Sequence, residues 1–303
     1  MPPLFTVFTP TFNRRHTLGR VYGSLKAQTL QDFEWLIVDD GSSDGTDAMV
    51  SGWRLEAPFE IQYVYQQNAG KHVAHNRALE VARGDLFLTL DSDDACVPTA
   101  LERLKFHWDS IPPALKDQFS GVTVLCVDEA GHLVGDEFPQ AILDCNPFEL
   151  TSSYDIRGEK WGFHRTEILR RFPFPVFNGE TFVAEGVVWN RVGREYKVRC
   201  VNERLRLFFR SANGISASIR DLRVRNPRGA RLYYQESLQS TGWSLVKWRQ
   251  ALNYVRFSLH AAVSPRRIIR ESGRPALITA IYWVGYAVHL VERNVRSGAS
   301  ART

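Results

Sequence analysis

The stretch DLFLTLDSDD, residues 85–94, joins a short apolar run to three carboxylates. A run this short and this apolar is typical of a buried strand, so the acids would stand where the strand leaves the sheet. Three crowded carboxylates repel one another unless a cation joins them. Their hard oxygens suit Mg²⁺ or Mn²⁺, which completes its shell with water and phosphate oxygens. Taken alone, the string fits a solvated acidic turn before a helix equally well.

Three similar units precede this stretch, each an apolar run followed by a helix-like segment. The runs and segments lie at residues 4–9 and 17–28, 33–40 and 44–53, and 61–66 and 72–83. A further helix follows, and Pro98 can occupy its first turn. Four β-then-α units in series predict an α/β fold with a mostly parallel, doubly wound sheet. In such sheets ligands bind at the carboxyl ends of the strands.

The connections after these four strands are unusually polar. They are TPTFNRR, DDGSSDGT, QNAGKH and DSDD, beginning at residues 9, 39, 67 and 91. A carboxylate at Asp39 or Asp40 can accept hydrogen bonds from a base imide or a ribose hydroxyl, while Gly41 and Gly45 permit a tight turn. The alternative is that these acids and serines cap a helix N-terminus.

Together the four motifs resemble the N-terminal half of family 2 glycosyltransferases, which have the GT-A fold. The match covers roughly residues 4–105, a third of the chain. The resemblance implies a GT-A (Rossmann-like) sheet flanked by helices. It also implies transfer, with inversion, of a sugar from a nucleoside-diphosphate donor, UDP- or dTDP-linked, to a hydroxyl acceptor.

The resemblance also assigns roles to individual residues. It places the following around the nucleotide: Thr9, Pro10, Thr11, Asn13, Arg14, Asp39, Asp40, Gly70, Lys71, Asn76, Asp91 and Ser92. Asp93 would bind the metal that bridges the diphosphate, and Asp94 would face a sugar. The family's Ala-Arg-Asn is Ala74-His75-Asn76 here, so His75 would supply that positive charge only in part or at lower pH.

The second half of the chain is expected to hold the catalytic base, which removes the proton of the acceptor hydroxyl. In the family the base lies in an acidic pair, often Glu-Asp, at a helix start. The matching stretch, residues 182–196, has Glu185 followed by Gly186. Glu185 is therefore the predicted base, with Glu180 as the substitute. A helix-start carboxylate favoured by the helix dipole is the competing role for Glu185.

Further positions carry weaker signals. Trp161 in KWGFHR resembles the family's acceptor-side aromatic, on which a sugar ring could stack, and a core tryptophan fits the same position. Arg210, Asn213 and Ser216 fall where the family closes a loop over the donor. Residues 197–210 alternate as a pair of strands would.

Charge divides the chain into two parts. The net charge is +5, yet residues 220–303 hold fifteen Lys/Arg and four Asp/Glu, a formal charge of +11. No zinc-finger, RNP-like or basic-zipper string accompanies this basic region, so we expect no nucleic-acid partner. We predict a catalytic domain at 1–215, with a nucleotide-sugar half at about 1–105 and an acceptor half at about 106–215. A basic helical extension follows at 216–303.

The segment ALITAIYWVGYAVHLV, residues 276–291, is apolar but shorter than the roughly 20 residues of a membrane span. Arg274, Arg293 and Arg296 flank it. It fits a packed annex helix or an interfacial helix on an anionic membrane surface. The N-terminus has no secretion signal, so we expect a cytoplasmic protein, peripheral on the inner face of the membrane in the second case. The acceptor would be a saccharide or lipid-linked saccharide of cell-envelope or exopolysaccharide synthesis.

Two other functions compete with transfer. Aspartates at strand ends also describe the phospho-acceptor receiver modules of signalling proteins, but those domains are much shorter than 303 residues. A protein that binds a nucleotide sugar without catalysis is the second alternative, suggested by Gly186 and His75.

Overall fold

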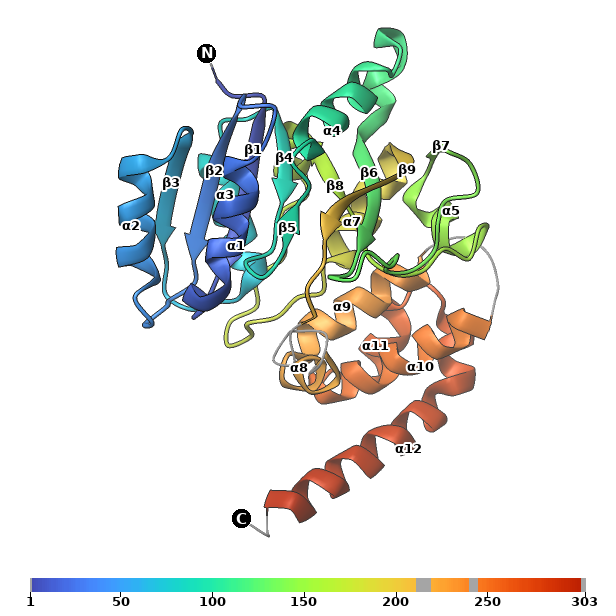
Figure 1. Cartoon of the computed structure of the whole chain (residues 1–303). Coiled ribbons are helices and arrows are strands. Elements are labelled where there is room, and N and C mark those ends of the chain that lie inside the picture. The colour runs from blue at the N-terminus through green and yellow to red at the C-terminus, as the bar shows by residue number, and fades with distance from the viewer. Residues whose placement is uncertain (1, 211–218, 240–244, 301–303) are drawn as a thin grey trace. The chain divides into compact units, whose positions relative to one another are not determined.

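The computed structural model describes residues 2–210, 219–239 and 245–300. Two compact units are present, each described by itself. The first comprises Met1–Phe174 and Arg191–Gly214, and the second comprises Pro175–Asn190 and Ile215–Thr303 (Figure 1). The second unit includes residues 175–190 in addition to the predicted C-terminal extension. The predicted domain boundary at 215–216 stays a prediction.

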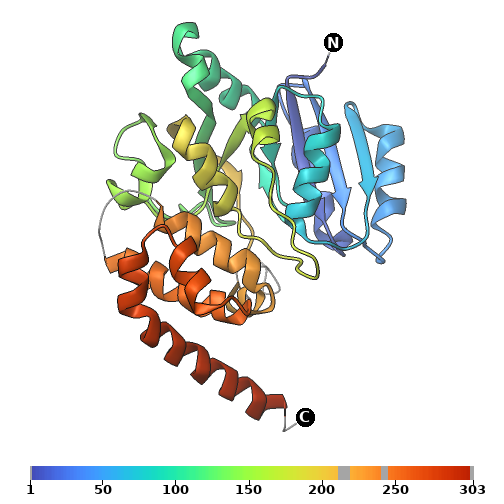
Figure 2. The ribbon, with the colours of Figure 1, turned by 180° about the vertical axis from the view of Figure 1, so that it is seen from behind.

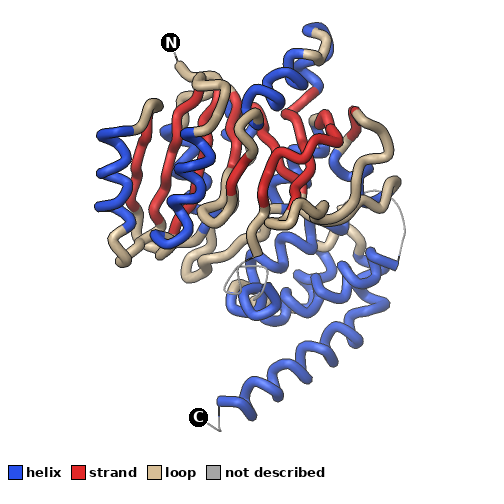
Figure 3. The backbone as a smooth tube through the Cα atoms, in the orientation of Figure 1, coloured by secondary structure: helices blue, strands red, loops and turns tan. Residues whose placement is uncertain are grey.

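A nine-stranded sheet forms the centre of the first unit, in the order β3-β2-β1-β4-β8-β6-β9-β5, with β7 paired to β9 (Figure 3). The strands are β1 (Phe5–Thr11), β2 (Phe33–Asp39), β3 (Glu60–Tyr65), β4 (Leu86–Thr89), β5 (Ala95–Cys96), β6 (Phe119–Val127), β7 (Ile142–Cys145), β8 (Lys160–Arg165) and β9 (Lys197–Leu207). The first four strands are parallel, whereas β8 runs antiparallel to both of its neighbours.

Helices follow these strands as the sequence predicts. They are α1 (Arg15–Lys26), α2 (Thr46–Glu56), α3 (Lys71–Val81), α4 (Ala100–Asp109), α5 (Pro147–Ser152), α6 (Thr166–Arg171) and α7 (Gly186–Glu195), with a 3₁₀ turn at Pro113–Gln118. Helix α1 covers the face of the sheet seen in Figure 1, and α3 covers the face seen in Figure 2. The α/β fold with helices flanking the sheet is confirmed.

The strand order explains where a site can form. The chain adds β2 and β3 on one side of β1 and then returns to place β4 on the other side. This reversal opens the connections after β1 and β4 away from each other, which is where open α/β sheets bind ligands. All seven residues of β1 and of β2 are buried, so only the ends of these strands offer side chains to a ligand.

The predicted strand pair at 197–210 is wrong, because these residues form the single long strand β9. This strand bridges much of the unit: it is parallel to β6 and antiparallel to β5 and β7. Its position matters because β5 directly follows the acidic turn.

Helices form the second unit, as predicted for the C-terminal extension. They are α8 (Ile219–Arg225), α9 (Pro227–Leu238), α10 (Leu245–His260), α11 (Pro265–Glu271) and α12 (Pro275–Ser300). Tyr254, Ile268 and Ile278 are fully buried at its centre. Within the described residues, α12 is the one helix whose length and composition would suffice to cross a membrane, over Pro275–Glu292, and 28% of that stretch is buried.

Candidate functional site

The acidic turn after β4 holds its three carboxylates in three different environments. Asp94 is fully buried and accepts hydrogen bonds from the Arg206 guanidinium, with Nε at 2.8 Å, and from the Phe209 amide at 2.9 Å. Burial raises the pKa of Asp94 to about 6, against the opposing effect of Arg206. Both oxygens are engaged inside the protein, so the predicted contact of Asp94 with a sugar does not fit this structure.

Asp91 lies between two cations. Its Oδ1 is 2.6 Å from Lys71 Nζ, and its Oδ2 is 3.0 Å from Arg206 Nη2. Burial alone would raise the pKa of Asp91, but Lys71 and Arg206 outweigh that effect and hold the pKa at about 2. Asp91 is therefore ionised, and both of its oxygens face positive charge.

Asp93 keeps the weakest ion pair of the three. Its side chain is 21% exposed, and Arg14 Nη1 lies 3.8 Å away, near the limit of an ion pair. Lys71 and Arg206 offset the charges of Asp91 and Asp94, so the carboxylate of Asp93 remains available to a cation. Among the described residues, no group of three or more Asp, Glu, His or Cys side chains is placed to hold a metal ion. A cation here would take one protein carboxylate and complete its shell with water and phosphate, as Mg²⁺ commonly does.

The acids at the end of β2 have neutral partners instead. Asp39 accepts hydrogen bonds from the Ser42 amide at 2.7 Å and the Tyr63 hydroxyl at 2.5 Å. Asp40 accepts them from the Ala69 and Gly70 amides, both at 2.8 Å. Both acids are buried. Asp40 thereby shapes the loop into α3, whose first residue is Lys71, and the backbone there turns through Gly70 at φ +98°.

The end of β1 is partly core. Thr9 is fully buried, and its hydroxyl accepts a hydrogen bond from the Trp35 indole at 2.9 Å, so its contact with the nucleoside stays a prediction that this geometry does not favour. Pro10 pairs with Val38 inside the sheet. The hydroxyl of Thr11 is buried without a hydrogen-bond partner in the described part of the chain.

Asn13 joins the loops that follow β1 and β2. Its side-chain oxygen accepts a hydrogen bond from the Ser43 backbone amide at 2.9 Å, and its backbone amide donates one to Ser42 Oγ at 2.8 Å. Asn13 has φ +52°, a left-handed conformation that asparagine tolerates better than most residues. The next residue is Arg14, so this turn sets the position of the guanidinium that pairs with the Asp93 carboxylate.

Two residues of α3 depart from their predicted roles. His75 is buried, with its ring 5.7 Å from Phe8 and 4.9 Å from Phe174. Burial, together with Lys71, lowers the pKa of His75 to about 3, so His75 supplies no positive charge near neutral pH. Asn76 donates to the Phe174 carbonyl and accepts from its amide, both at 2.8 Å. These bonds fix the chain at Phe174 rather than a nucleotide.

Trp161 on β8 belongs to the core. It is 4% exposed, and its indole donates a hydrogen bond to the Thr89 carbonyl at 2.7 Å. No ring face is open to a sugar, so the core alternative describes it better than the predicted stacking role. Ser92 is also buried. Arg210 is exposed, while Asn213 and Ser216 lie outside the described residues.

In the second unit, Glu185 is exposed and stands immediately before α7. Glu180, the substitute base, accepts hydrogen bonds from the Arg228 and Gly229 amides at 2.8 and 2.9 Å, so it caps the first turn of α9. A Cβ at Gly186 would lie 2.7 Å from the Tyr233 ring. The packing of Tyr233 therefore accounts for the glycine where the family often has aspartate.

Arg206 is the main residue that the sequence analysis missed. It lies buried in β9 and contacts both Asp91 and Asp94. Arg20 of α1 has a related role: its Nη1 donates to the Asp93 carbonyl at 2.5 Å, and its guanidinium lies 3.7 Å above the Phe209 ring. Both arginines hold the acidic turn against the end of β9. The sequence of β9 did not single it out, because Arg199 and Arg204 lie in the same strand.

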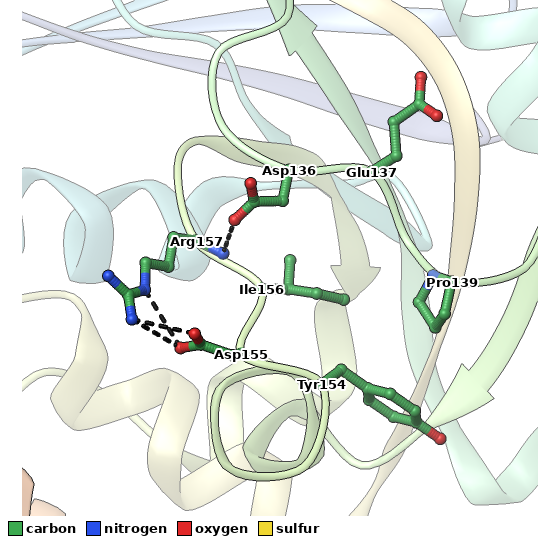
Figure 4. A pocket seen from close by; sticks show the side chains of 7 residues that line it. All are labelled: Asp136, Glu137, Pro139, Tyr154, Asp155, Ile156 and Arg157. Atoms are coloured by element: carbon green, nitrogen blue, oxygen red, sulfur yellow. Dashed lines mark hydrogen bonds and ion pairs between the residues drawn. The ribbon is translucent and has the colours of Figure 1, made fainter.

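An open cavity of about 460 Å³ lies elsewhere in the first unit (Figure 4). Its lining consists of Asp136, Glu137, Pro139, Tyr154, Asp155, Ile156 and Arg157. The lining holds three carboxylates and one guanidinium: Arg157 pairs with Asp155 at 2.9 Å, and its backbone amide donates to Asp136. Glu137 pairs with Arg204. Such a charge balance disfavours an anionic ligand, and none of the predicted site residues lines the cavity.

Comparison with known proteins matches residues 6–119 to a family model described as glycosyl transferase family 2. The putative teichuronic acid biosynthesis glycosyltransferase TuaG of Bacillus subtilis is 36% identical over 102 residues, 33% of this chain and 40% of that protein. The GalNAc(5)-diNAcBac-PP-undecaprenol beta-1,3-glucosyltransferase of Campylobacter jejuni is 34% identical over 104 residues, 34% of this chain and 33% of that protein. The chain thus matches well under half the length of these relatives.

Similarity to solved structures extends over nearly the whole chain. Residues 1–349 of TarS from S. aureus, in complex with UDP, give a TM-score of 0.61 at 17% identity, covering 97% of this chain and 91% of that one. The mannosyltransferase PcManGT from Pyrobaculum calidifontis, in complex with GDP-Man and Mn²⁺, gives 0.53 at 18% identity, covering 96% and 81%. At this identity the likeness shows a shared fold.

Proposed function

We propose that the protein is an inverting, metal-dependent glycosyltransferase, because residues 6–119 match the glycosyl transferase family 2 model and the sheet has a GT-A-like fold. It would move a sugar from a nucleoside-diphosphate donor to a hydroxyl acceptor. The observation that carries this proposal is the charge arrangement after β4: two acids are matched by Lys71 and Arg206, and Asp93 keeps a loosely paired carboxylate.

In the proposed donor complex, the diphosphate lies beside Asp93, with Lys71 and Arg14 supplying positive charge. When bound, Mg²⁺ or Mn²⁺ would be held by Asp93 and would offset the charge of the departing diphosphate. Asp39 and Asp40 keep the loops that border the nucleoside in place. Gly70 lets the backbone turn closely beside it.

The proposed transfer breaks the bond between the anomeric carbon and the diphosphate oxygen as the acceptor oxygen bonds from the opposite face. Glu185 takes the proton of the acceptor hydroxyl, as a general base. Attack from the face opposite the leaving group inverts the anomeric centre. Positive charge on the sugar ring and negative charge on the leaving oxygens both grow in the transition state, so fixed charges near the diphosphate accelerate the step.

Similar proteins support the choice of substrates. The complexes of TarS with UDP and of PcManGT with GDP-Man favour a nucleotide-sugar donor, and we propose a UDP- or dTDP-sugar. The relatives named for teichuronic acid and for an undecaprenol-linked glycan favour a cell-envelope or exopolysaccharide acceptor, a saccharide or lipid-linked saccharide. Such an acceptor would place the enzyme peripherally at the inner face of the membrane.

Release of nucleoside diphosphate from a panel of nucleotide sugars, with Mn²⁺ and candidate acceptors, tests the proposal. The wild type should turn over at least one donor. Glu185→Gln should lower that turnover about 100-fold or more, the usual range for a general base, while leaving the donor Kd unchanged. Glu180→Gln is the matched control: it should weaken the α9 cap and retain turnover. If Glu185→Gln turns over donor like the wild type, the assigned base is wrong. If the wild type binds every donor without turnover, the protein is a binding module.

A further inference from the structure

Helix α12 has two apolar faces, of which one is covered. Leu277, Ile278 and Ile281 are buried in the core that α12 shares with α9, α10 and α11. The other face is exposed although it is equally apolar. Its exposed fractions are 73% for Trp283, 56% for Val284, 36% for Tyr286, 37% for Leu290 and 63% for Val291. Soluble proteins rarely leave so many large apolar side chains together in water unless the surface binds something.

Trp283 and Leu290 belong to a row of exposed apolar residues along one side of the helix, and Val284, Tyr286 and Val291 flank this row. Ala276, Ala280, Trp283, Ala287 and Leu290 recur every three or four residues and are all exposed, which places them along a single side of the helix. The row extends from Ala276 to Leu290 along α12, the helix labelled in Figure 1. We call it the α12 stripe.

The surface of the second unit is cationic. Residues 220–303 carry a formal charge of +11. Three of the four acids in these residues are committed: Glu271 pairs with Arg231, Glu292 pairs with Arg256, and Glu236 is buried. Residues 175–190 of the same unit add Glu180 and Glu185. Exposed arginines include Arg225 and Arg228 near α9, Arg249 on α10, and Arg266 and Arg270 on α11. The unit therefore offers apolar and aromatic surface together with an excess of positive charge.

We propose that the α12 stripe binds in the plane of a lipid bilayer whose surface carries anionic headgroups. An interfacial helix buries one apolar face at the boundary of headgroups and acyl chains and gains from attraction between arginines and anionic lipid. Trp283 and Tyr286 suit that boundary, because their rings combine an apolar body with a polar tip. The inference is independent of the proposed transfer reaction.

The packing of α12 on α10 favours this orientation over a transmembrane one. A Cβ on Gly285 would lie 2.7 Å from Val255 Cγ1, so the two helices are in close contact midway along the stretch. Further along, Glu292 accepts a hydrogen bond from Arg256 Nε at 2.5 Å. A helix joined along its length to a cationic partner cannot cross the bilayer without taking α10 and Arg256 into hydrocarbon, which is costly.

Charge also favours lipid over a second copy of the chain. Two copies joined through the α12 stripe would bring two units of the same strong positive charge together. Repulsion between them would oppose association, whereas an anionic surface attracts the same charge.

Flotation of the full chain with vesicles tests the proposal. One set contains phosphatidylcholine alone, and the other contains about three parts phosphatidylcholine to one part phosphatidylglycerol. The wild type should float with the anionic vesicles, and added salt should weaken the binding. The double variant Trp283→Glu/Leu290→Glu should lower the vesicle partition coefficient about tenfold or more. Leu55→Glu on α2, at a side chain 91% exposed, introduces the same chemistry elsewhere and should bind like the wild type.

Four results would overturn the inference. The first is a wild type that floats with neither vesicle set, and the second is a double variant that floats like the wild type while retaining its Tm. The third is a wild type that is dimeric by light scattering and binds no vesicles, together with a double variant that is monomeric. The fourth is resistance of the membrane-bound protein in cells to alkaline carbonate extraction, which would indicate a helix that spans the membrane instead of lying in its plane.

Discussion

The ends of β2 and β4 both carry buried aspartates, yet the two regions differ in what holds the charge. Asp39 and Asp40 receive hydrogen bonds from backbone amides and a tyrosine hydroxyl, which are neutral donors. Asp91 and Asp94 receive them from Lys71 and Arg206, which are cations. Amide donors fix the shape of a loop, whereas cations fix the charge of a site. The acids of β2 therefore organise backbone, and those of β4 balance charge around Asp93.

Arg206→Met is the change from which we expect the largest effect, because it removes the cation shared by Asp91 and Asp94. Removal of the guanidinium leaves Asp94 buried without its counter-charge, and breaking one partner of a buried pair costs about 3–5 kcal/mol. We expect the free energy of unfolding to fall by that amount in urea denaturation at neutral pH. Asp94→Asn combined with Arg206→Met should recover part of the loss, because the unpaired charge is then removed.

Arg204→Met is the matched control for this change. Arg204 lies two residues earlier on β9, is 53% exposed and pairs with Glu137 at 3.1 Å. An exposed pair contributes about 0–1 kcal/mol, so the control should stay close to the wild type. Equal effects of Arg206→Met and Arg204→Met would show that the cations of the β4 region do not stabilise its acids.

Asp93→Asn sharpens the comparison from the side of function. Asparagine has nearly the same shape, and Asp93 is partly exposed, so the free energy of unfolding should stay within about 0.5 kcal/mol. Turnover of the donor, measured as nucleoside diphosphate released with Mn²⁺, should fall about 100- to 1,000-fold, the range for losing one electrostatic group.

Asp40→Asn should behave in the opposite way. It replaces a charged acceptor of two backbone amides and places an NH₂ group among donors, at a cost of about 1.5–3 kcal/mol of stability.

Should Asp93→Asn retain more than about a tenth of the wild-type turnover, the proposed role of Asp93 in binding the cation fails.

The sequence was sufficient for the fold, and it points to the edge of the sheet at which we propose the site, because both inferences depend on local patterns. Alternating apolar runs and helix signals give the β-α units, and polar connections mark the carboxyl edge of the sheet. Arg206 could not be found in that way. It lies 112 residues from Asp94, and β9 reaches the acidic turn through its pairing with β5, in which Cys96 is opposite Arg206.

Side-chain direction set a second limit. Thr9 occupies a motif position, but its hydroxyl turns to the Trp35 indole, and no residue pattern distinguishes that from an outward hydroxyl. Trp161 and Asn76 are similar cases, since each is of a type that binds ligands and each is used by the backbone of a neighbouring segment. Residue type indicates which bonds a side chain can make, whereas packing decides which partner receives them.

The smallest expected effect is on the pH dependence of stability. It tests whether His75 and His164 are neutral in the folded protein. Burial lowers the pKa of His75 to about 3 and that of His164 to about 4. The unfolded chain binds protons at these histidines below about pH 6.5, while the folded chain does not, so acid favours unfolding. Stability should therefore fall as pH drops from about 6.5, by up to about 1.4 kcal/mol per pH unit and per histidine.

His75→Leu should remove the His75 share of this pH dependence, while the contributions of His164 and of His72, whose pKa burial also lowers, remain. Urea denaturation at about pH 7, 6 and 5 measures the slope, independently of any loss of stability from the altered packing at neutral pH. His132→Leu is the control, since the His132 side chain is 79% exposed. An unchanged slope in His75→Leu would mean that His75 takes up its proton in the folded protein, as the arginine-like role beside Lys71 would require.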